Sequence, residues 1–178
     1  MVRIYTRKGD DGTTGLLYGG RVGKESPVIG LNGAVDEAQA ALGLARAEAV
    51  RGGELDLILV DLERDLWVLM AEVATAPDNR HKLAPGTSLV TAEMVDGLES
   101  LIDRMGERFE MPTEFVVPGQ DRRSALLDMA RTVVRRAERS SLNMPKGSQI
   151  GAYLNRLSDL CWVLARWQEG EYRATRRK

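Results

Sequence analysis

Apolar residues recur at helical spacing along most of the chain after the first 26 residues. The first apolar face is formed by four residues at steps of three or four: Val35, Ala38, Leu42 and Ala45. The second face continues the same spacing: Leu55, Leu59, Leu62, Leu66, Leu69 and Val73. Because a helix turns by about 100° per residue, these patterns predict helices over about 28–50 and 55–73.

Three further helices are predicted in the second half of the chain. Thr91 is a candidate N-cap for the third, whose apolar side carries Val95, Leu98, Ile102 and Met105. The fourth is predicted over about 121–141. The fifth is predicted over 148–169, with Ser148 as N-cap and with this apolar stripe: Ile150, Tyr153, Leu154, Leu157, Cys161 and Leu164.

Two segments are predicted to lie outside the helices of this half. Prolines punctuate residues 111–120, so this stretch is expected to be an extended connector. The basic tail, 171–178, is expected to be frayed.

These patterns predict an all-α fold, an antiparallel five-helix bundle of four long helices plus one. We expect one domain over 1–178, with a glycine-rich segment over 1–26, the bundle over 27–170 and the tail over 171–178. The first two helices carry more Ala, Leu and Val than one small bundle covers, which favours burial against other subunits.

Composition excludes several classes of protein. The chain has 178 residues, of which 43% are hydrophobic and 29% charged, so a disordered body is excluded. The formal net charge is -1, which argues against nucleic acid or an anionic membrane as partner. A single cysteine, Cys161, and the lack of a long apolar run indicate a cytoplasmic protein that does not cross a membrane. His81 has no Cys or His at metal-ligand spacing, so no metal site is expected.

The N-terminal segment contains six glycines between residues 9 and 23. Closely spaced glycines let backbone N–H groups approach an anion, and Thr13, Thr14, Lys8 and Lys24 could complete a polyphosphate site. The Walker A motif is absent. From residue types alone, a flexible tail and a phosphate site are equally good interpretations.

The predicted fourth helix carries a stripe of mixed charge. Asp128, Arg131, Arg135 and Glu138 share about one quadrant of the helix, with Arg139 adjacent. One interpretation is a solvated, salt-bridged face. The other is a site for phosphate or carboxylate, because arginine binds these groups in a bidentate way.

Six segments in order and spacing resemble the PduO-type ATP:cob(I)alamin adenosyltransferases, and they span nearly the whole chain. The segments are IYTRKGDDGTTGL (4–16), RVGK (21–24), VDE (35–37), FVVPG (115–119), ARTVVRRAER (130–139) and LNRLSD (154–159).

The resemblance implies a homotrimer with active sites between subunits and an N-terminal segment that orders on ATP. By position, the ATP site comprises Thr6, Arg7, Lys8, Gly9, Thr14, Gly15, Lys24, Arg135, Arg136, Ala137, Glu138, Arg139 and Asn155. Arg135 and Glu138 match catalytic residues, with Glu138 fixing either the Arg135 guanidinium or a ribose hydroxyl. Asp36 and Arg131 match a pair that bridges two subunits, and Phe115 matches the aromatic residue that closes over the corrin.

The activity implied by this resemblance is transfer of the 5′-deoxyadenosyl group of ATP to Co(I) of a reduced cobalamin, with release of triphosphate. ATP, Mg²⁺ and the corrinoid are the implied ligands, and a corrinoid reductase and an adenosylcobalamin-dependent acceptor enzyme are the implied partners. The chain departs from the family at Gln120, where a glycine is frequent, and at Asp128, where a histidine is frequent. These two residues motivate an alternative, a non-catalytic carrier or sensor that binds nucleotide or corrinoid.

Overall fold

The computed structural model describes residues 4–176. Within this range five α-helices make up most of the chain: α1 (Pro27–Ala47), α2 (Glu54–Val73), α3 (Ala92–Gly106), α4 (Arg122–Ser140) and α5 (Ile150–Glu169). Shorter elements accompany them: strands β1 (Thr13–Gly15) and β2 (Arg21–Gly23), and 3-10 helices η1 (Pro77–Lys82) and η2 (Ser141–Asn143). The prediction of a mostly helical chain is confirmed, and the small sheet is an addition to it.

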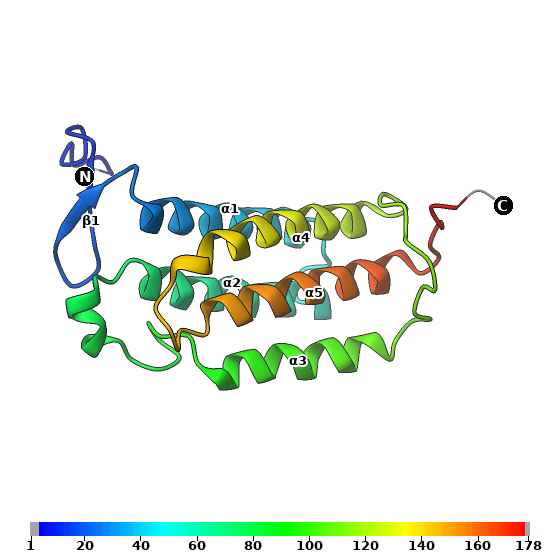
Figure 1. The fold of residues 1–178 in the computed structure, drawn as a ribbon. Helices are drawn as coiled ribbons and strands as arrows, with labels where there is room; N and C mark the ends of the chain where they lie inside the picture. The colour runs from blue at the N-terminus through cyan, green and yellow to red at the C-terminus, as the bar shows by residue number, and fades with distance from the viewer. Residues whose placement is uncertain (1–3, 177–178) are drawn as a thin grey trace.

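Helix α4 packs against α1 on one side and α5 on the other, while α2 packs against α1 and α3 against α5. Figure 1 shows α1 and α4 side by side above α2 and α5, with α3 at the lower edge. The chain reverses direction at each connection, so α3 and α5 run the same way. Consecutive helices are therefore antiparallel, while α3 and α5, which pack together, run parallel.

The predicted apolar faces form the core. Val35, Ala38, Leu42 and Ala45 of α1 are fully buried, as are the apolar stripe residues of α5 that the spacing identified. Those of α2 are also buried. On α3, Thr91 caps the helix as predicted, accepting a hydrogen bond from the Met94 N–H at 3.3 Å. Burial of these residues is the main favourable contribution to folding, at about 25 cal/mol per Å² of apolar surface.

The glycine-rich segment forms a β-hairpin, which the hydrophobic pattern did not predict. Strands β1 and β2 pair antiparallel, with Thr14 opposite Val22. The turn places Tyr18, Gly19 and Gly20 at positive φ, a conformation for which glycine has the least steric cost. The Leu17 N–H donates to the Ala74 carbonyl at 2.8 Å, which ties the hairpin to the end of α2.

Two expectations about the later segments are wrong. Gln149, not Ser148, is the N-cap residue of α5, although the Ser148 hydroxyl accepts from the Ile150 N–H at 3.4 Å while it donates to Glu72. The tail is not frayed over its described part: the Val117 N–H donates to the Arg173 carbonyl, and the Thr175 N–H donates to the Phe115 carbonyl. These bonds occur because the extended connector otherwise leaves its backbone groups without partners. Residues 177–178 of the predicted tail lie outside the described residues.

Within residues 4–176, no helix has the length and apolar composition needed to cross a membrane.

Glu72 is a buried carboxylate at the hairpin end of the bundle. Its side chain has no exposed surface. One oxygen accepts from Arg80 and from the Ser148 hydroxyl, each at 2.7 Å, and the other accepts from the Val90 N–H at 2.8 Å. A buried carboxylate requires such donors, and here they join η1 and the segments that lead into α3 and α5.

We expect Glu72→Ala to lower the free energy of unfolding by about 3 kcal/mol, because it leaves buried donors without an acceptor. Urea denaturation followed by circular dichroism measures this. Asp61→Ala is the matched control, since Asp61 forms an exposed ion pair with Arg64 and its loss should change stability little. A Glu72 variant as stable as this control would contradict the role assigned to the carboxylate.

Candidate active site

A cleft of about 300 Å³ opens between α4, α5 and the connector 111–120. Six polar residues line it: Asp128, Arg131, Arg135, Ser158, Asp159 and Arg166. Phe115 and Trp162 supply apolar surface, and both also line a second cavity of about 480 Å³. Phe115 is 87% exposed, an unusual state for a phenylalanine in the absence of a ligand or a partner.

Helix α4 brings three residues of the predicted charge stripe into this cleft. The helix begins at a capping box, in which Asp121 accepts from the Ser124 N–H and the Ser124 hydroxyl lies within hydrogen-bond distance of the Asp121 N–H. Asp128, Arg131 and Arg135 follow at steps of three and four, so they lie on one face. No hydrogen bond or ion pair to the Arg135 guanidinium occurs among residues 4–176. Its positive charge is therefore available to an anion.

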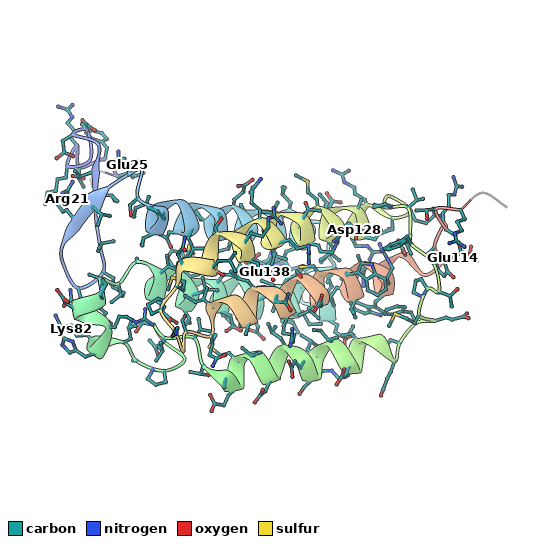
Figure 2. The ribbon with its side chains drawn as sticks, in the orientation of Figure 1. Arg21, Glu25, Lys82, Glu114, Asp128 and Glu138 are labelled. Atoms are coloured by element: carbon teal, nitrogen blue, oxygen red, sulfur yellow. The ribbon has the colours of Figure 1, made fainter. Side chains whose placement is uncertain are left out.

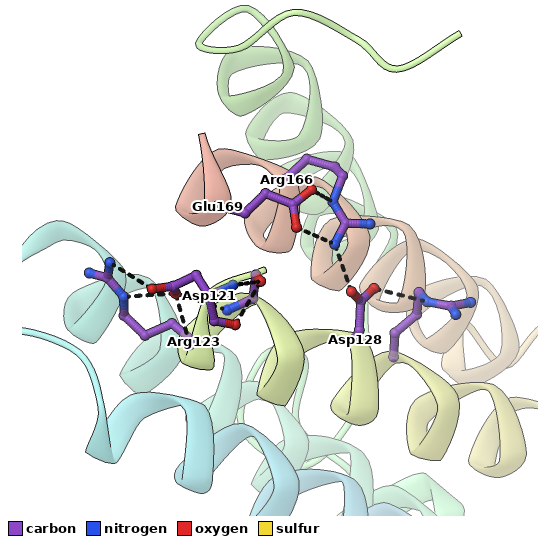
Figure 3. Close-up of polar contacts among 7 residues, drawn as sticks. Asp121, Arg123, Asp128, Arg166 and Glu169 are labelled. Atoms are coloured by element: carbon purple, nitrogen blue, oxygen red, sulfur yellow. Dashed lines mark hydrogen bonds and ion pairs between the residues drawn. The ribbon is translucent and has the colours of Figure 1, made fainter. Parts of the chain in front are cut away.

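Asp128 is held by a buried arginine that the sequence analysis did not identify. The Arg166 guanidinium donates to Asp128 Oδ2 at 2.6 Å and pairs with Glu169 at 2.6 Å, as Figure 3 shows. Burial raises the pKa of Glu169, and the charge of Arg166 opposes that rise. The i, i+3 spacing of Arg166 and Glu169 was a readable signal, but the pairing with Asp128, 38 residues away, was not.

Arg131 completes this cluster on the cleft side. Its Nε lies 3.8 Å from Asp128 Oδ1 and, although buried, forms no hydrogen bond among the described residues. A buried N–H without an acceptor is costly. The atom has almost no accessible surface, so Asp128 is its nearest charged partner in the described chain.

Glu138 and Asn155 lie together, as the resemblance implied for two residues of one site. The Asn155 amide nitrogen donates to Glu138 Oε1 at 2.8 Å. No ion pair joins Glu138 to Arg135 in the described part of the chain; the Arg135 carbonyl instead accepts from Arg139 at 3.0 Å. Of the two roles considered for Glu138, contact with a ribose hydroxyl is the one this geometry leaves open.

The two residues between Arg135 and Glu138 point elsewhere. Arg136 forms an ion pair with Glu37 of α1. Ala137 is fully buried, so its side chain belongs to the core and not to a nucleotide site. The Ala137 carbonyl accepts from the Ser141 N–H at the end of α4.

The N-terminal candidates lie on the hairpin and just before it. Thr6, Arg7 and Lys8 are exposed, and Thr14 and Gly15 belong to β1.

Gly9 and Lys24 form the best-defined contact of this segment. The Lys24 ammonium donates to the Gly9 carbonyl at 2.7 Å. A Cβ at Gly9 would lie 3.2 Å from the Thr13 carbonyl oxygen and 3.3 Å from Lys24 Nζ, so glycine permits this close approach.

The candidate residues are spread along the bundle. Figure 2 shows Arg21 and Glu25 at one end and Glu114 at the other, with Glu138 and Asp128 between them. A helix of 20 residues is about 30 Å long, and no hydrogen bond or ion pair among residues 4–176 joins the hairpin to α4. Asp36 is exposed on α1 and makes no contact of this kind with Arg131 in the described chain. Within residues 4–176 the two halves of the predicted ATP site therefore make no polar contact with each other.

No group of three or more His, Cys, Asp or Glu side chains suited to a metal ion occurs among the described residues.

The helices and the cleft define a class of protein: a helical protein with an arginine-lined cleft beside an apolar surface. The profile of the family "Cobalamin adenosyltransferase" matches residues 4–168. The chain belongs to this family.

Relatives and solved structures agree with this assignment. The chain is 38% identical to a corrinoid adenosyltransferase of Citrobacter freundii over 173 residues, covering 95% of this chain and 96% of the relative. It is 38% identical to one of Mycobacterium tuberculosis over 172 residues, covering 93% and 88%. A variant of a PduO-type ATP:corrinoid adenosyltransferase from Lactobacillus reuteri, solved with cobalamin and ATP, superposes with a TM-score of 0.81 at 25% identity, covering 94% and 91%.

We expect Arg166→Met to lower the free energy of unfolding by about 3–5 kcal/mol near pH 7, because two carboxylates lose their buried cation. The pKa of Glu169, already raised by burial, should rise further. The folded variant then binds a proton more tightly than the unfolded chain, so the deficit shrinks as the pH falls through that pKa.

Urea denaturation of both proteins at several pH values measures this difference. Arg123→Met is the matched control, since Arg123 pairs with Asp121 near the surface. A deficit that does not change with pH would contradict the electrostatic account.

Proposed function

We propose that this chain transfers the 5′-deoxyadenosyl group of ATP to Co(I) of a reduced corrinoid, giving adenosylcobalamin and triphosphate. The electron pair of Co(I) forms the bond to the 5′ carbon, while the bond from that carbon to oxygen breaks and its electron pair leaves with triphosphate. Membership of the family favours this catalytic function over a non-catalytic carrier.

The observation that carries the proposal is the Arg135 guanidinium in the cleft. It has no side-chain partner among the described residues. Negative charge grows on the leaving triphosphate in the transition state. Fixed guanidinium groups stabilise such charge without reorganising, which is an efficient use of binding energy.

Glu138 and Asn155 would position the nucleoside. The carboxylate of Glu138 accepts one hydrogen bond from Asn155 and retains lone pairs for a ribose hydroxyl. Holding the ribose fixes the direction of the 5′ carbon relative to cobalt, which lowers the entropic part of the barrier. Mg²⁺ bound to the triphosphate would, together with Lys24 and Arg135, neutralise the negative charge of the triphosphate.

Phe115 would cover the lower face of the corrin. Its exposed ring borders both cavities, and in this proposal it would exclude water and an axial ligand from cobalt. Four-coordinate Co(II) is easier to reduce, which is a way for a protein to tune its cofactor. Asp128 is committed to Arg166, so we propose that it supports the cleft instead of contacting the corrin. Gln120 is exposed and remains a candidate for corrin contact.

We also propose that the five helices form the bundle of a homotrimer with its sites between subunits. The hairpin of one subunit would meet α4 of its neighbour, with Asp36 and Arg131 paired across the interface. Exposed apolar side chains support this: Leu44 on α1 is 54% exposed and Met129 on α4 is 56% exposed. A corrinoid reductase and an adenosylcobalamin-dependent acceptor enzyme remain predicted partners of this chain.

Mixing the protein anaerobically with Co(I) cobalamin and Mg-ATP should replace the Co(I) absorbance band with that of a light-sensitive alkylcobalamin. Arg135→Ala should lower kcat/KM by about 100- to 1,000-fold, the range found when one donor to a developing charge is removed. Arg104→Ala, at an exposed position near the end of α3, is the control and should match the wild type. An unchanged spectrum with the wild-type protein would refute the proposed activity.

The trimer is tested by complementation between two inactive variants. Lys24→Ala and Arg135→Ala subunits, refolded together in equal amounts, should recover about one quarter of the wild-type rate, since one site in four then combines an intact hairpin with an intact α4. Sedimentation measures the assembly. No recovery from well-mixed trimers would show that each site lies within one subunit.

A further inference from the structure

We infer that Arg156 and Glu99 are positioning residues that hold the Asn155 amide against Glu138. This inference rests on the function proposed above, in which Asn155 and Glu138 orient the nucleoside.

Four side chains from three helices form one continuous chain of hydrogen bonds. Glu138 of α4 accepts from the Asn155 amide nitrogen at 2.8 Å. The Asn155 amide oxygen accepts from the Arg156 guanidinium at 2.5 Å. Arg156 Nε donates in turn to Glu99 Oε1 of α3 at 2.7 Å. The candidate site on α4 is thereby connected to α3, which does not line the cleft.

The hydrogen-bonding chemistry of each group determines the order of donors and acceptors in this series of hydrogen bonds. A carboxylate only accepts, so Glu138 must face the NH₂ end of the Asn155 amide. The oxygen end of the amide then needs a donor, which Arg156 supplies. A guanidinium has N–H groups on more than one edge, so Arg156 binds Asn155 and Glu99 at the same time.

Without Arg156, the Asn155 amide would be held at one end only. The terminal torsion of asparagine is broad and roughly two-fold, so the amide would populate rotations that turn its nitrogen away from Glu138. Glu138 would lose the hydrogen bond that fixes its rotamer. The ribose contact would then form less often in the productive geometry, and small misplacements of this kind lower rates substantially.

The exposure of the Arg156–Glu99 pair argues against a purely structural role. The two side chains are 38% and 48% exposed, and exposed pairs contribute little to stability. Arg108 and Glu54 form a matched pair elsewhere, with side chains 40% and 49% exposed and a contact of 2.6 Å. That pair touches none of the candidate site residues, and Arg108 lies instead over the Trp167 ring, 4.8 Å from its centroid.

The first test compares kinetics of the two pairs. Arg156→Met should lower kcat/KM for ATP about 10-fold, and Glu99→Gln should lower it by a smaller factor, with KM for the corrinoid unchanged. Arg156→Lys, which keeps one donor, should restore part of the loss. Glu54→Gln and Arg108→Met should leave the kinetics at wild-type values. All variants should melt within the range of these two controls.

The second test asks whether Arg156 acts through Asn155. In an Asn155→Ala background, Arg156→Met should cause no further loss of kcat/KM, because the group it positions is gone. Independent, multiplying losses would overturn the inference, as would wild-type kinetics for Arg156→Met alone.

A third measurement does not depend on turnover. The side-chain amide resonances of Asn155, assigned by their absence in Asn155→Ala, should shift in Arg156→Met and stay in place in Arg108→Met. Failure of the wild-type protein to turn over would refute the proposed function and leave this readout intact. Unshifted Asn155 resonances in Arg156→Met would refute the positioning role itself.

Discussion

Helix α4 is packed on two sides, against α1 and against α5. This constraint determines where the charged residues of α4 lie. A helix with two covered sides has only a narrow strip left for polar groups. Asp128, Arg131 and Arg135 occupy the part of that strip which faces the cleft, whereas Arg136 turns to α1. The core and the candidate site are therefore two faces of one helix, and a change in its packing would change both.

Charge in the interior is tolerated at Arg166 and Glu72 because each of them has partners at short distance. Arg166 is shared by two carboxylates, and Glu72 is shared by three donors. These clusters lie at different ends of the bundle. The first supports the arginine-lined cleft, and the second holds the segments around the hairpin. Buried ion pairs of this kind add little net stability, so their main contribution is to fix the relative positions of helices and loops.

The helices and their apolar faces were predictable because, in a helix that packs on a core, apolar residues at helical spacing lie on the face that is buried. Arg131 and Arg135 were also predictable as neighbours, since spacing within one helix defines a face. The β-hairpin was not, because three-residue strands carry no period. Nor were the partners of Asp128 and Glu72, which come from residues 38 and 76 positions away. The roles of Thr6, Arg7 and Lys8 came from the resemblance alone, since no hydrogen bond or ion pair joins this segment to α4 among residues 4–176.

The pairing of the connector with the C-terminal segment has a consequence for variation among related sequences. The position of Phe115 depends on N–H groups of Val117 and Thr175 and on carbonyls of Phe115 and Arg173, all of which belong to the backbone. Side chains in both segments can therefore be substituted while the backbone pairing that positions the Phe115 ring is preserved. Proline is the exception, since it lacks the N–H. Sequences that keep this geometry should accept many residues at positions 117 and 175 but exclude proline from both.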